Sequence, residues 1–285
     1  AVDPNSSLYI AGLREVHDQR GFTISLGNWT VPVYESNAAT PRYDVELTEP
    51  WRGANWMMGV PIPSGAAPDP EADGHMTVLD RATGCEFDFY RARHEAGRWT
   101  AGWAKTVRTT ESGVHPYGYS MRGSGFANLA GVIWPQELRS GEIKHALIFS
   151  YPYTSALGAV EPATETDGQS LRGDALPEGA RLQLDPSLDL DTLPLQPYER
   201  TIAQALQRYG MYLADTGGGI NLYAVHPQSY PFNAYEGLLP PGSYPPLPHI
   251  PIDSFRVIEL GPVTPPWVLR SRARLVPTGC ATMRW

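Results

Sequence analysis

The sequence predicts a mainly β protein, a β-sandwich or jelly roll with one substantial helix and long loops rich in proline and glycine. Three observations favour this fold class. Short segments in which apolar and polar residues alternate recur along the chain. The 28 glycines and 28 prolines are spread between these segments, as expected for irregular loops that join strands. One segment alone has the apolar spacing of a long amphipathic helix.

The 285 residues fit one large β domain, and we expect a single domain over residues 1–285. A chain of this length can bury a hydrophobic core without help from a metal or a disulfide. Alternating β-branched and aromatic residues predict strands, in chain order, within 22–34 (two short strands around Gly27-Asn28), 43–49, 75–80, 84–92, 97–108, 142–153, 180–185, 211–215, 220–226 and 254–260.

The helix is expected at 197–210, because Ile202, Ala205, Leu206 and Tyr209 form one apolar stripe and Gly210 ends it. A single helical turn is expected at 135–141. Loops are expected at the proline-rich segments 59–74 and 239–251 and at the polar, aromatic segment 109–125. Loops as long as 109–125 often carry function.

The charge pattern argues against two classes of partner. The formal net charge is −8, and the only two lysines, Lys105 and Lys144, are far apart. A nucleic-acid or anionic-membrane surface needs clustered positive charge, so we expect no nucleic-acid partner. No run of 18 apolar residues occurs, so no transmembrane segment is expected.

The two cysteines leave two possibilities open. Cys85 and Cys280 would be free thiols in a reducing cytosol, whereas they would pair in an oxidising compartment. The chain begins with AVDPNSS, a small residue before a polar turn, as expected after cleavage of a signal peptide. Together these features favour a secreted, extracellular protein.

Several segments resemble a group of secreted bacterial proteins that are mostly uncharacterised. The matching segments are DGHMTVLD, LAGVIWPQELRSGEIKHAL, PEGARLQL and ALQRYGMYLADTG, which lie in this order within residues 73–217. They include D-x-H, G-x-I-x-H-A-L and A-L-x-x-Y-G-M-x-x-A-D motifs. Similar proteins have C-x-L-Y-E-L where this chain has C-E-F-D-F-Y, and Asp88 is the nearer match to their carboxylate. Their W-P-A-R-H is replaced by EPATE at 161–165, so the resemblance transfers no role for that arginine and histidine.

The strand around 85–90 raises the question of a catalytic pair. Period two places Cys85, Phe87 and Phe89 on one face, which we expect to be core, and Glu86 and Asp88 on the other. An E-x-D strand is similar to that of sandwich-type retaining glucanases, whose E-x-D-x-x-E motif has a third carboxylate. That position is Arg91 here. Glu86 and Asp88 therefore either line a sugar-binding groove or simply face solvent.

Four further residues are candidates for catalysis. Asp73 and His75 could share a proton or bind a metal, or they could be a turn cap and a surface histidine. His145 falls on the apolar face of a predicted strand, where it is either a core residue or a general base. Asp215 precedes a glycine-rich turn, so it is either a turn residue or a second carboxylate.

Aromatic side chains in or beside loops could stack on sugar rings, although they could equally fill the core. The predicted substrate-binding residues are Trp99, Trp103, Tyr117, Tyr119, Arg122 and Trp134.

The leading hypothesis is a secreted carbohydrate-active enzyme, a glycoside hydrolase or a polysaccharide lyase, that acts on an extracellular polysaccharide. It requires Asp73, His75, Glu86, Asp88, His145 and Asp215 to converge on one cleft. The alternative is a non-catalytic module that binds glycans or assembles with copies of itself through its proline-rich segments. No cofactor is expected, with a metal at His75 and His145 as a third possibility.

Overall fold

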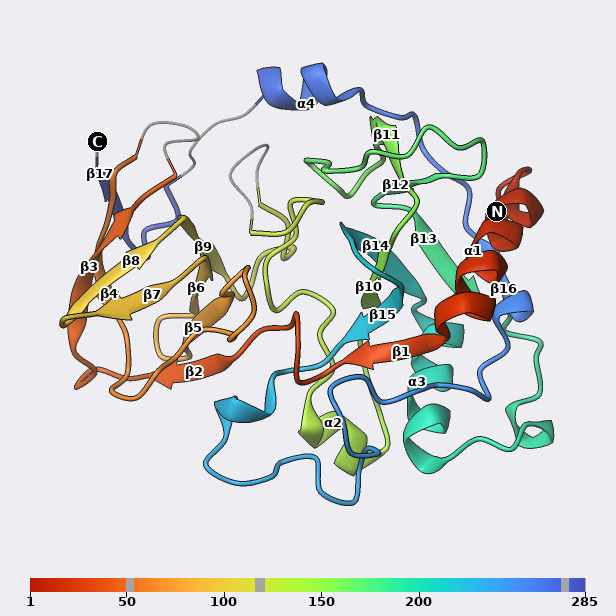
Figure 1. Ribbon diagram of the computed structural model, residues 1–285, viewed down its shortest axis with the longest axis horizontal. Coiled ribbons are helices and arrows are strands. Elements are labelled where there is room, and N and C mark those ends of the chain that lie inside the picture. Colours follow the sequence, from red (N-terminus) through yellow and green to blue (C-terminus); the bar gives the residue numbers. More distant parts are fainter. Residues whose placement is uncertain (50–53, 116–120, 273–276, 285) are drawn as a thin grey trace.

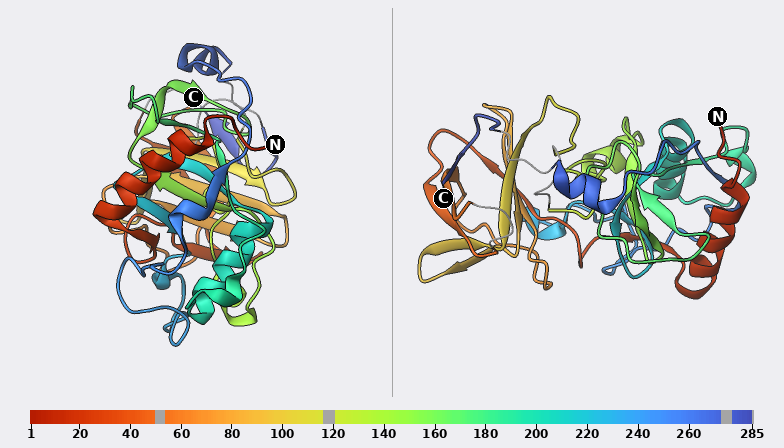
Figure 2. Two further views of the ribbon diagram at one scale, coloured as in Figure 1. Left: turned by 90° about the vertical axis from the view of Figure 1, so that its right-hand side faces the viewer. Right: turned by 90° about the horizontal axis from the view of Figure 1, so that it is seen from above.

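The computed structural model describes residues 1–49, 54–115, 121–272 and 277–284, which form two β-rich lobes side by side (Figure 1). The prediction of a mainly β chain is confirmed, because the described residues form seventeen strands in four sheets and four α-helices. The expectation of a single domain stays a prediction. Figure 2 shows the lobes from two further sides.

The first lobe contains two sheets, of order β17-β4-β3-β8-β7 and β2-β5-β6-β9. Its strands are β2 (Val33–Ser36), β3 (Arg42–Leu47), β4 (Trp56–Pro61), β5 (Met76–Asp80), β6 (Cys85–Tyr90), β7 (Arg93–Glu95), β8 (Arg98–Ala101), β9 (Trp103–Arg108) and β17 (Thr282–Arg284).

One hydrophobic core fills the space between these two sheets. Phe87 and Phe89 of β6 lie in this core, on the face that the sequence predicts. β5 and β6 form the predicted hairpin, with paired residues from Met76↔Phe89 to Asp80↔Cys85. β4 contradicts one expectation, because it extends to Pro61 and so takes the first three residues of the predicted 59–74 loop.

A disulfide joins Cys85 of β6 to Cys280, just before β17, with 5.7 Å between the two Cα atoms. The structure thus selects the paired alternative. The bond fixes the C-terminal strand to the first lobe, although the chain between the two cysteines passes through the second lobe.

We expect the substitution Cys280→Ser to lower the free energy of unfolding by about 2–5 kcal/mol, because it removes a crosslink that restrains the unfolded chain. Chemical denaturation at neutral pH measures this difference. Dithiothreitol should destabilise the native protein by a similar amount and leave the variant unchanged. An equal effect of the reductant on both proteins would contradict the prediction.

The second lobe is built on a six-stranded mixed sheet of order β1-β15-β10-β14-β13-β16. Its strands are β1 (Phe22–Ser25), β10 (Leu147–Tyr151), β13 (Arg181–Leu184), β14 (Met211–Thr216), β15 (Ile220–Tyr223) and β16 (Phe255–Val257), with a separate pair formed by β11 (Thr154–Ala159) and β12 (Leu176–Glu178). The helices are α1 (Ser6–Arg20), α2 (Pro135–Ser140), α3 (Pro197–Arg208) and α4 (Pro266–Ser271), and short 3-10 turns lie at Leu190–Thr192, Pro227–Ser229 and Ile252–Ser254.

Two helices share one core with one face of the six-stranded sheet. α3 confirms the predicted helix and contributes Ile202 and Leu206 to that core. α1 is a helix that our sequence analysis missed, and it contributes Ile10, Leu13 and Val16 to the same core. The opposite face of the sheet packs in part against a smaller apolar core and in part lines a pocket.

The 239–251 segment packs against its own chain. The amide of Ile24 donates to the carbonyl of Pro245 (2.9 Å), and the amide of Leu247 donates to the carbonyl of Phe22 (2.8 Å). Leu247 and Ile250 are fully buried. This segment therefore behaves as an irregular neighbour of β1 and is not an arm extended toward another molecule. None of the described helices is long and apolar enough to cross a membrane.

Candidate functional site

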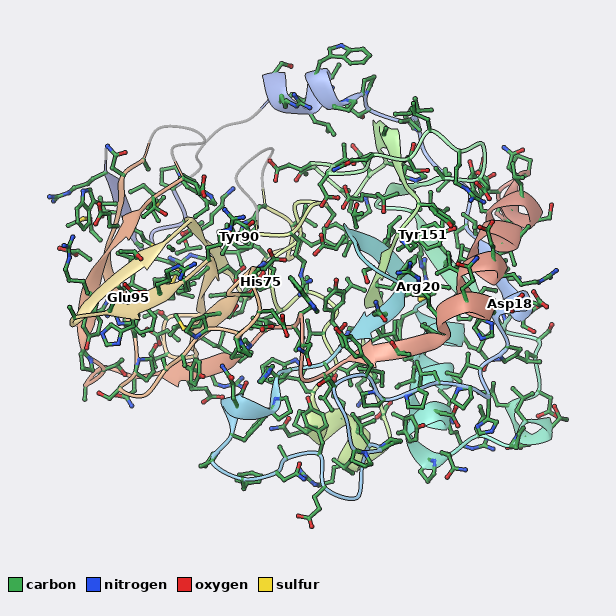
Figure 3. All side chains as sticks on the ribbon, in the orientation of Figure 1. Asp18, Arg20, His75, Tyr90, Glu95 and Tyr151 are labelled. Carbon is green, nitrogen blue, oxygen red and sulfur yellow. A yellow bond between two sulfur atoms is a disulfide. The ribbon has the colours of Figure 1, made fainter. Side chains whose placement is uncertain are left out.

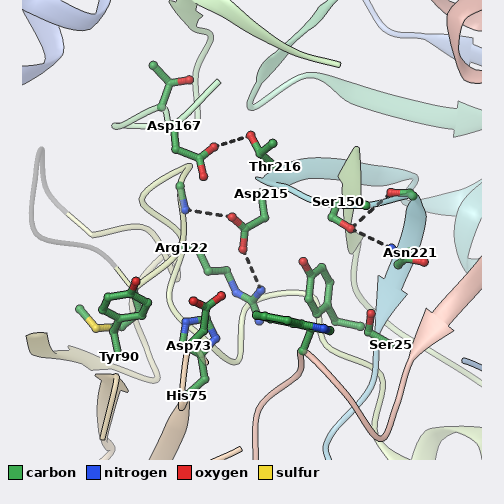
Figure 4. A pocket seen from close by; sticks show the side chains of 18 of the residues that line it. Ser25, Asp73, His75, Tyr90, Arg122, Ser150, Asp167, Asp215, Thr216 and Asn221 are labelled. Atoms are coloured by element: carbon green, nitrogen blue, oxygen red, sulfur yellow. Dashed lines mark hydrogen bonds and ion pairs between the residues drawn. The ribbon is translucent and has the colours of Figure 1, made fainter. Parts of the chain in front are cut away.

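A pocket of about 1050 Å³ lies between the two lobes. Figure 3 shows His75 and Tyr90 on the side of the first lobe that faces the second. Figure 4 shows the polar side chains that meet in the pocket. Its lining includes Thr23, Ser25, Trp29, Asp73, His75, Tyr90, Arg122, Ser150, Asp167, Asp215, Asn221, Tyr223 and Tyr244.

Strand alternation explains the contribution of the second lobe. In β1, Phe22 and Ile24 belong to the core, whereas Thr23 and Ser25 line the pocket. In β15, Ile220 and Leu222 belong to the core, whereas Asn221 and Tyr223 line the pocket. Period two thus turns one face of the sheet toward the helices and the other toward the pocket.

Asp215 reaches the pocket because the alternation of β14 is interrupted. Met211 and Leu213 are core residues, so strict alternation would also direct Asp215 into the core. Phe149 pairs with Leu213, but the next residue, Ser150, pairs with Asp215, so Ala214 is the extra residue of a bulge. Bulges of this kind re-aim side chains next to active sites.

The glycine-rich segment 217–219 passes beside the end of β10. β14 and β15 flank β10 and do not pair with each other, so this segment must cross between them. A Cβ atom on Gly217 would lie 2.6 Å from the Ser150 hydroxyl. Glycine at this position therefore allows the backbone to close one side of the pocket.

Three carboxylates from separate segments meet at this wall. Single oxygens of Asp167, Glu178 and Asp215 all lie within 4.8 Å of one another. The Thr216 hydroxyl donates to Asp167 Oδ1 (2.5 Å), and the Asp167 amide donates to Glu178 Oε2 (3.1 Å). Gly123 closes the group, because its amide lies 3.4 Å from Asp215 Oδ1 and a Cβ there would lie 2.6 Å from Asp167 and Glu178.

The members of this cluster differ in their access to solvent. Burial, and then the negative charge of Asp167, raise the pKa of Asp215 to about 7. Burial also raises the pKa of the fully buried Glu178 well above its usual range. Asp167 is exposed in the pocket, and 19% of the Asp215 side chain is exposed, so a ligand can reach both carboxylates. The cluster thus pairs a protonatable acid with an accessible neighbour.

Arg122 is the cation nearest to Asp215. Its Nη1 lies 3.8 Å from Asp215 Oδ2, its guanidinium lies 4.4 Å from the centre of the Tyr223 ring, and its Nη2 donates to the Asn128 carbonyl (3.0 Å). In Figure 4 the guanidinium lies between Asp215 and the pair formed by Asp73 and His75.

The same three carboxylates are the one group of described residues whose ligand atoms lie close enough together to surround a metal ion. The positive charge of Arg122 beside Asp215 opposes a second cation there. The raised pKa values of Asp215 and Glu178 supply an alternative way to relieve the crowded charge. Protonation and cation binding are thus the two ways in which this cluster can relieve its negative charge. Neither His75 nor His145 belongs to it.

The first lobe contributes Asp73, His75 and Tyr90. His75 precedes β5 and Tyr90 ends the paired strand β6, so their rings lie 5.7 Å apart. Burial and the nearby Arg122 lower the pKa of His75 to about 3, and its Nε2 has no hydrogen-bond partner among the described residues. Burial raises the pKa of the half-buried Asp73 carboxyl.

We expect neutral His75 to make the protein less stable in acid. Below its unfolded pKa of about 6.5, His75 binds a proton only in the unfolded chain, so stability falls as pH decreases. The loss approaches about 1.4 kcal/mol per pH unit, or about 2 kcal/mol at pH 5.

Urea unfolding of the native protein and His75→Gln at pH 7 and pH 5 measures this effect. The variant should lose less stability over that interval. Exposed His94→Gln serves as the control and should follow the native protein. Parallel losses in native protein and His75→Gln would refute the prediction.

Glu86 and Asp88 lie outside the pocket, under segment 126–129. Asp88 Oδ2 accepts the Asn128 amide (2.9 Å), and Glu86 Oε1 accepts the Leu129 amide (3.0 Å). Their side of β6 is opposite the core, as expected, but both residues are buried, so neither faces solvent nor a groove.

The pKa values of the two carboxyl groups are shifted in opposite directions. Burial, and then the negative charge of Asp88, raise the pKa of Glu86. Burial opposes ionisation of Asp88 as well, but contacts with His115, Asn128 and Thr77 outweigh it and lower the pKa of Asp88. Glu86 is therefore the protonated partner.

His145 lies away from the pocket. It precedes β10, although our sequence analysis expected it within that strand. Its Nε2 lies 2.9 Å from Glu137 Oε1 of α2, and its Nδ1 lies 2.9 Å from the Ala146 carbonyl. Burial lowers the pKa of His145, but the contacts with Glu137 and the Ala146 carbonyl outweigh it. The pKa of His145 is therefore raised.

The described members of the predicted substrate-binding set lie in three different places. Trp99 and Trp103 are buried in the core of the first lobe. Trp134 precedes α2 and packs against a small core between the lobes. Tyr117 and Tyr119 lie outside the described residues. Arg122 lines the pocket.

Several residues of the site were not predicted from the sequence. They are the lining residues Trp29, Ser150, Asp167, Asn221, Tyr223 and Tyr244, and the buried Glu178 behind Asp167. Alternation in β1 and β15 could have indicated Thr23, Asn221 and Tyr223, since these polar or amphipathic side chains alternate with core residues. Asp167, in an Asp-Gly dipeptide, has only the signature of a turn.

Comparisons with protein-family models, curated proteins and solved structures gave no match to this chain. The resemblance to a group of secreted bacterial proteins therefore stays a prediction.

Proposed function

We propose that this protein is a secreted glycoside hydrolase that acts on an extracellular polysaccharide in the pocket between its lobes. The observation that carries the proposal is the proximity of a partly buried carboxyl, Asp215, and an exposed one, Asp167, at the same wall. Glycoside hydrolysis commonly needs one protonated and one ionised carboxyl group beside the scissile bond.

In the proposed mechanism, Asp215 donates its proton to the glycosidic oxygen as the bond from that oxygen to the anomeric carbon breaks. Asp167 attacks the anomeric carbon and forms a glycosyl ester. Asp215, now ionised, removes a proton from water, and that water displaces Asp167 from the sugar. One water molecule is consumed and both carboxyl groups return to their first state.

The spacing is compatible with retention of the anomeric configuration. Carboxyl groups about 5–5.5 Å apart are typical of retaining enzymes, and about 6.5–9.5 Å is typical of inverting enzymes. Oxygens of Asp167 and Asp215 within 4.8 Å of each other are compatible with the first class. The resting proton on Asp215 is supported by its pKa of about 7.

The remaining pocket chemistry suits a carbohydrate. Four aromatic side chains of the described residues line the pocket: Trp29, Tyr90, Tyr223 and Tyr244. Aromatic faces can cover the apolar C–H surface of a sugar ring while hydroxyl and amide groups, such as those of Thr23 and Asn221, bind its hydroxyls. The disulfide supports export to an oxidising environment.

A β-sandwich is retained as a proposal for the first lobe alone, because its two sheets share one core. The alternative function, non-catalytic glycan binding, is supported by Trp29 and Tyr244, whose side chains line the pocket and are still 44% and 43% exposed. A lyase mechanism in which His145 is the base is not proposed. The His145 side chain contacts Glu137, and neither residue lines the pocket.

A panel of neutral and acidic polysaccharides, with product mass spectrometry and NMR of the newly formed anomeric centre, tests the proposal. We expect cleavage by addition of water, retained configuration, and activity in the presence of EDTA. Unsaturated products would indicate a lyase, and inverted products would exclude Asp167 as nucleophile. Binding without cleavage by any polysaccharide would favour the alternative.

A further inference from the structure

Glu86 and Asp88 are connected to the pocket through one short segment. They accept the backbone amides of Leu129 and Asn128, respectively, at 3.0 and 2.9 Å. Asp88 is itself held from β5, because the Thr77 hydroxyl donates to its Oδ1 (2.7 Å). His115 Nε2 lies 3.5 Å from Asp88 Oδ2. A rigid hairpin thus clamps the backbone at 128–129.

The residues just before segment 126–129 lie beside the carboxylates of the pocket. Arg122 Nη2 donates to the Asn128 carbonyl (3.0 Å), and Arg122 Nη1 lies 3.8 Å from Asp215 Oδ2. The next residue, Gly123, directs its amide toward Asp215 Oδ1 (3.4 Å). The Ser124 amide donates to the Ala214 carbonyl (3.2 Å), at the bulge that turns Asp215 into the pocket.

These contacts form one continuous path. The amide of Asn128 binds Asp88, and the carbonyl of Asn128 binds Arg122, so a shift of this residue would displace the guanidinium. The guanidinium of Arg122 is also restrained on its other side, because it lies over the Tyr223 ring, 4.4 Å from the ring centre. The position of the positive charge beside Asp215 therefore depends on the clamp at β6.

We propose that Asp88 and Glu86 are positioning residues that hold segment 126–129 and thereby fix Arg122 and the Gly123 amide against Asp215. They do not touch the substrate. Their influence on catalysis rests on the proposed role of Asp215, but their influence on the charge state of Asp215 does not.

The test compares Asp88→Ala, which removes the clamp, with Asp88→Asn, whose amide oxygen can still accept the Asn128 amide. Asp80→Ala is the matched control. Asp80 is also buried in the same sheet and accepts two backbone amides, those of Ala82 and Thr83, but it holds a turn that does not line the pocket.

The readout is the pKa of Asp215, followed by NMR of carboxyl-¹³C-labelled protein and assigned by the signal that Asp215→Asn loses. We expect Asp88→Ala to raise this pKa by about one unit, because the retreat of Arg122 removes a favourable charge interaction with ionised Asp215. Asp88→Asn and Asp80→Ala should leave it within a few tenths of the native value. The melting temperature should fall for both alanine variants, because a purely structural role would also lower it.

Either an unchanged Asp215 pKa in Asp88→Ala or an equal shift in Asp80→Ala would overturn the proposal. If Asp88→Ala does not fold, Thr77→Val removes the hydroxyl that restrains Asp88, and a smaller upward shift is expected. An unchanged value there would also overturn it. No substrate is needed, so a polysaccharide panel without cleavage would refute the hydrolase while leaving this result intact.

Discussion

Asp215→Asn is expected to lower kcat/KM for polysaccharide cleavage at least about 10³-fold, or about 4 kcal/mol in transition-state stabilisation. Asparagine preserves the size of the side chain and can still accept the Gly123 amide, but it cannot donate an acidic proton to the leaving oxygen. The loss should appear mainly in kcat, since binding to the aromatic rings is unchanged. Steady-state kinetics on the polysaccharide identified by the panel measures it.

The pH profile supplies a second readout of the same residue. Asp215 must be protonated to act as an acid, and its pKa is about 7, so kcat/KM of the native enzyme should decrease as pH rises through this value. Above it the decrease approaches tenfold per pH unit. This basic limb should disappear from any residual activity of Asp215→Asn.

Asp191→Asn is the matched control, because 85% of that side chain is exposed and it lies outside the pocket. It should retain native kinetics. Native-like cleavage by a folded Asp215→Asn protein would exclude Asp215 as the acid. Activity that is lost after EDTA treatment and restored by an added divalent cation would instead indicate that the carboxylates hold a metal.

The elements that were predictable have strong local signals. β5 and β6 have alternating residues on both sides of a turn, and α3 has an apolar stripe with proline near its start and glycine after its end. α1 was missed because it contains Gly12 and follows a polar turn. That glycine is explained only by tertiary structure, since a Cβ there would lie 2.7 Å from Asp174 Oδ2.

The site was less predictable because it depends on contacts between distant segments. Six catalytic candidates were expected to converge on one cleft. Asp73, His75 and Asp215 line one pocket, whereas Glu86, Asp88 and His145 lie outside it. Asp215 nevertheless reaches it through a bulge that no periodicity indicates. Asp167 and Glu178 come from a loop and a three-residue strand, where pattern gives no face.

The Glu86-Asp88 strand shows why an exposed carboxylate pair cannot be assumed from alternation. Period two correctly separates these side chains from the core of the first lobe, but it does not reveal that segment 126–129 covers the other face. The backbone amides of that segment, and not solvent or substrate, are the partners of the carboxyl groups. A chemically suggestive strand can thus serve a site from outside it.

Asp167→Ala is expected to abolish hydrolysis, with a loss on the order of 10⁴-fold or more, because no other described carboxylate lies as exposed beside Asp215 to attack the anomeric carbon. Asp215 would still be able to protonate the leaving oxygen. The variant should therefore accumulate no covalent intermediate but keep its affinity for the polysaccharide, as measured by calorimetry.

Azide provides a direct test of the assigned role. The shortened side chain leaves space on the face from which Asp167 attacks, so azide can form a bond to the anomeric carbon as the glycosidic bond breaks and Asp215 protonates the departing oxygen. The product should be a glycosyl azide of inverted configuration, in contrast to the retained product of the native enzyme. Azide should not restore activity to Asp215→Asn on a substrate whose leaving oxygen needs protonation. If Asp167→Ala hydrolyses polysaccharide at the native rate, or if azide yields only the retained product, another residue is the nucleophile.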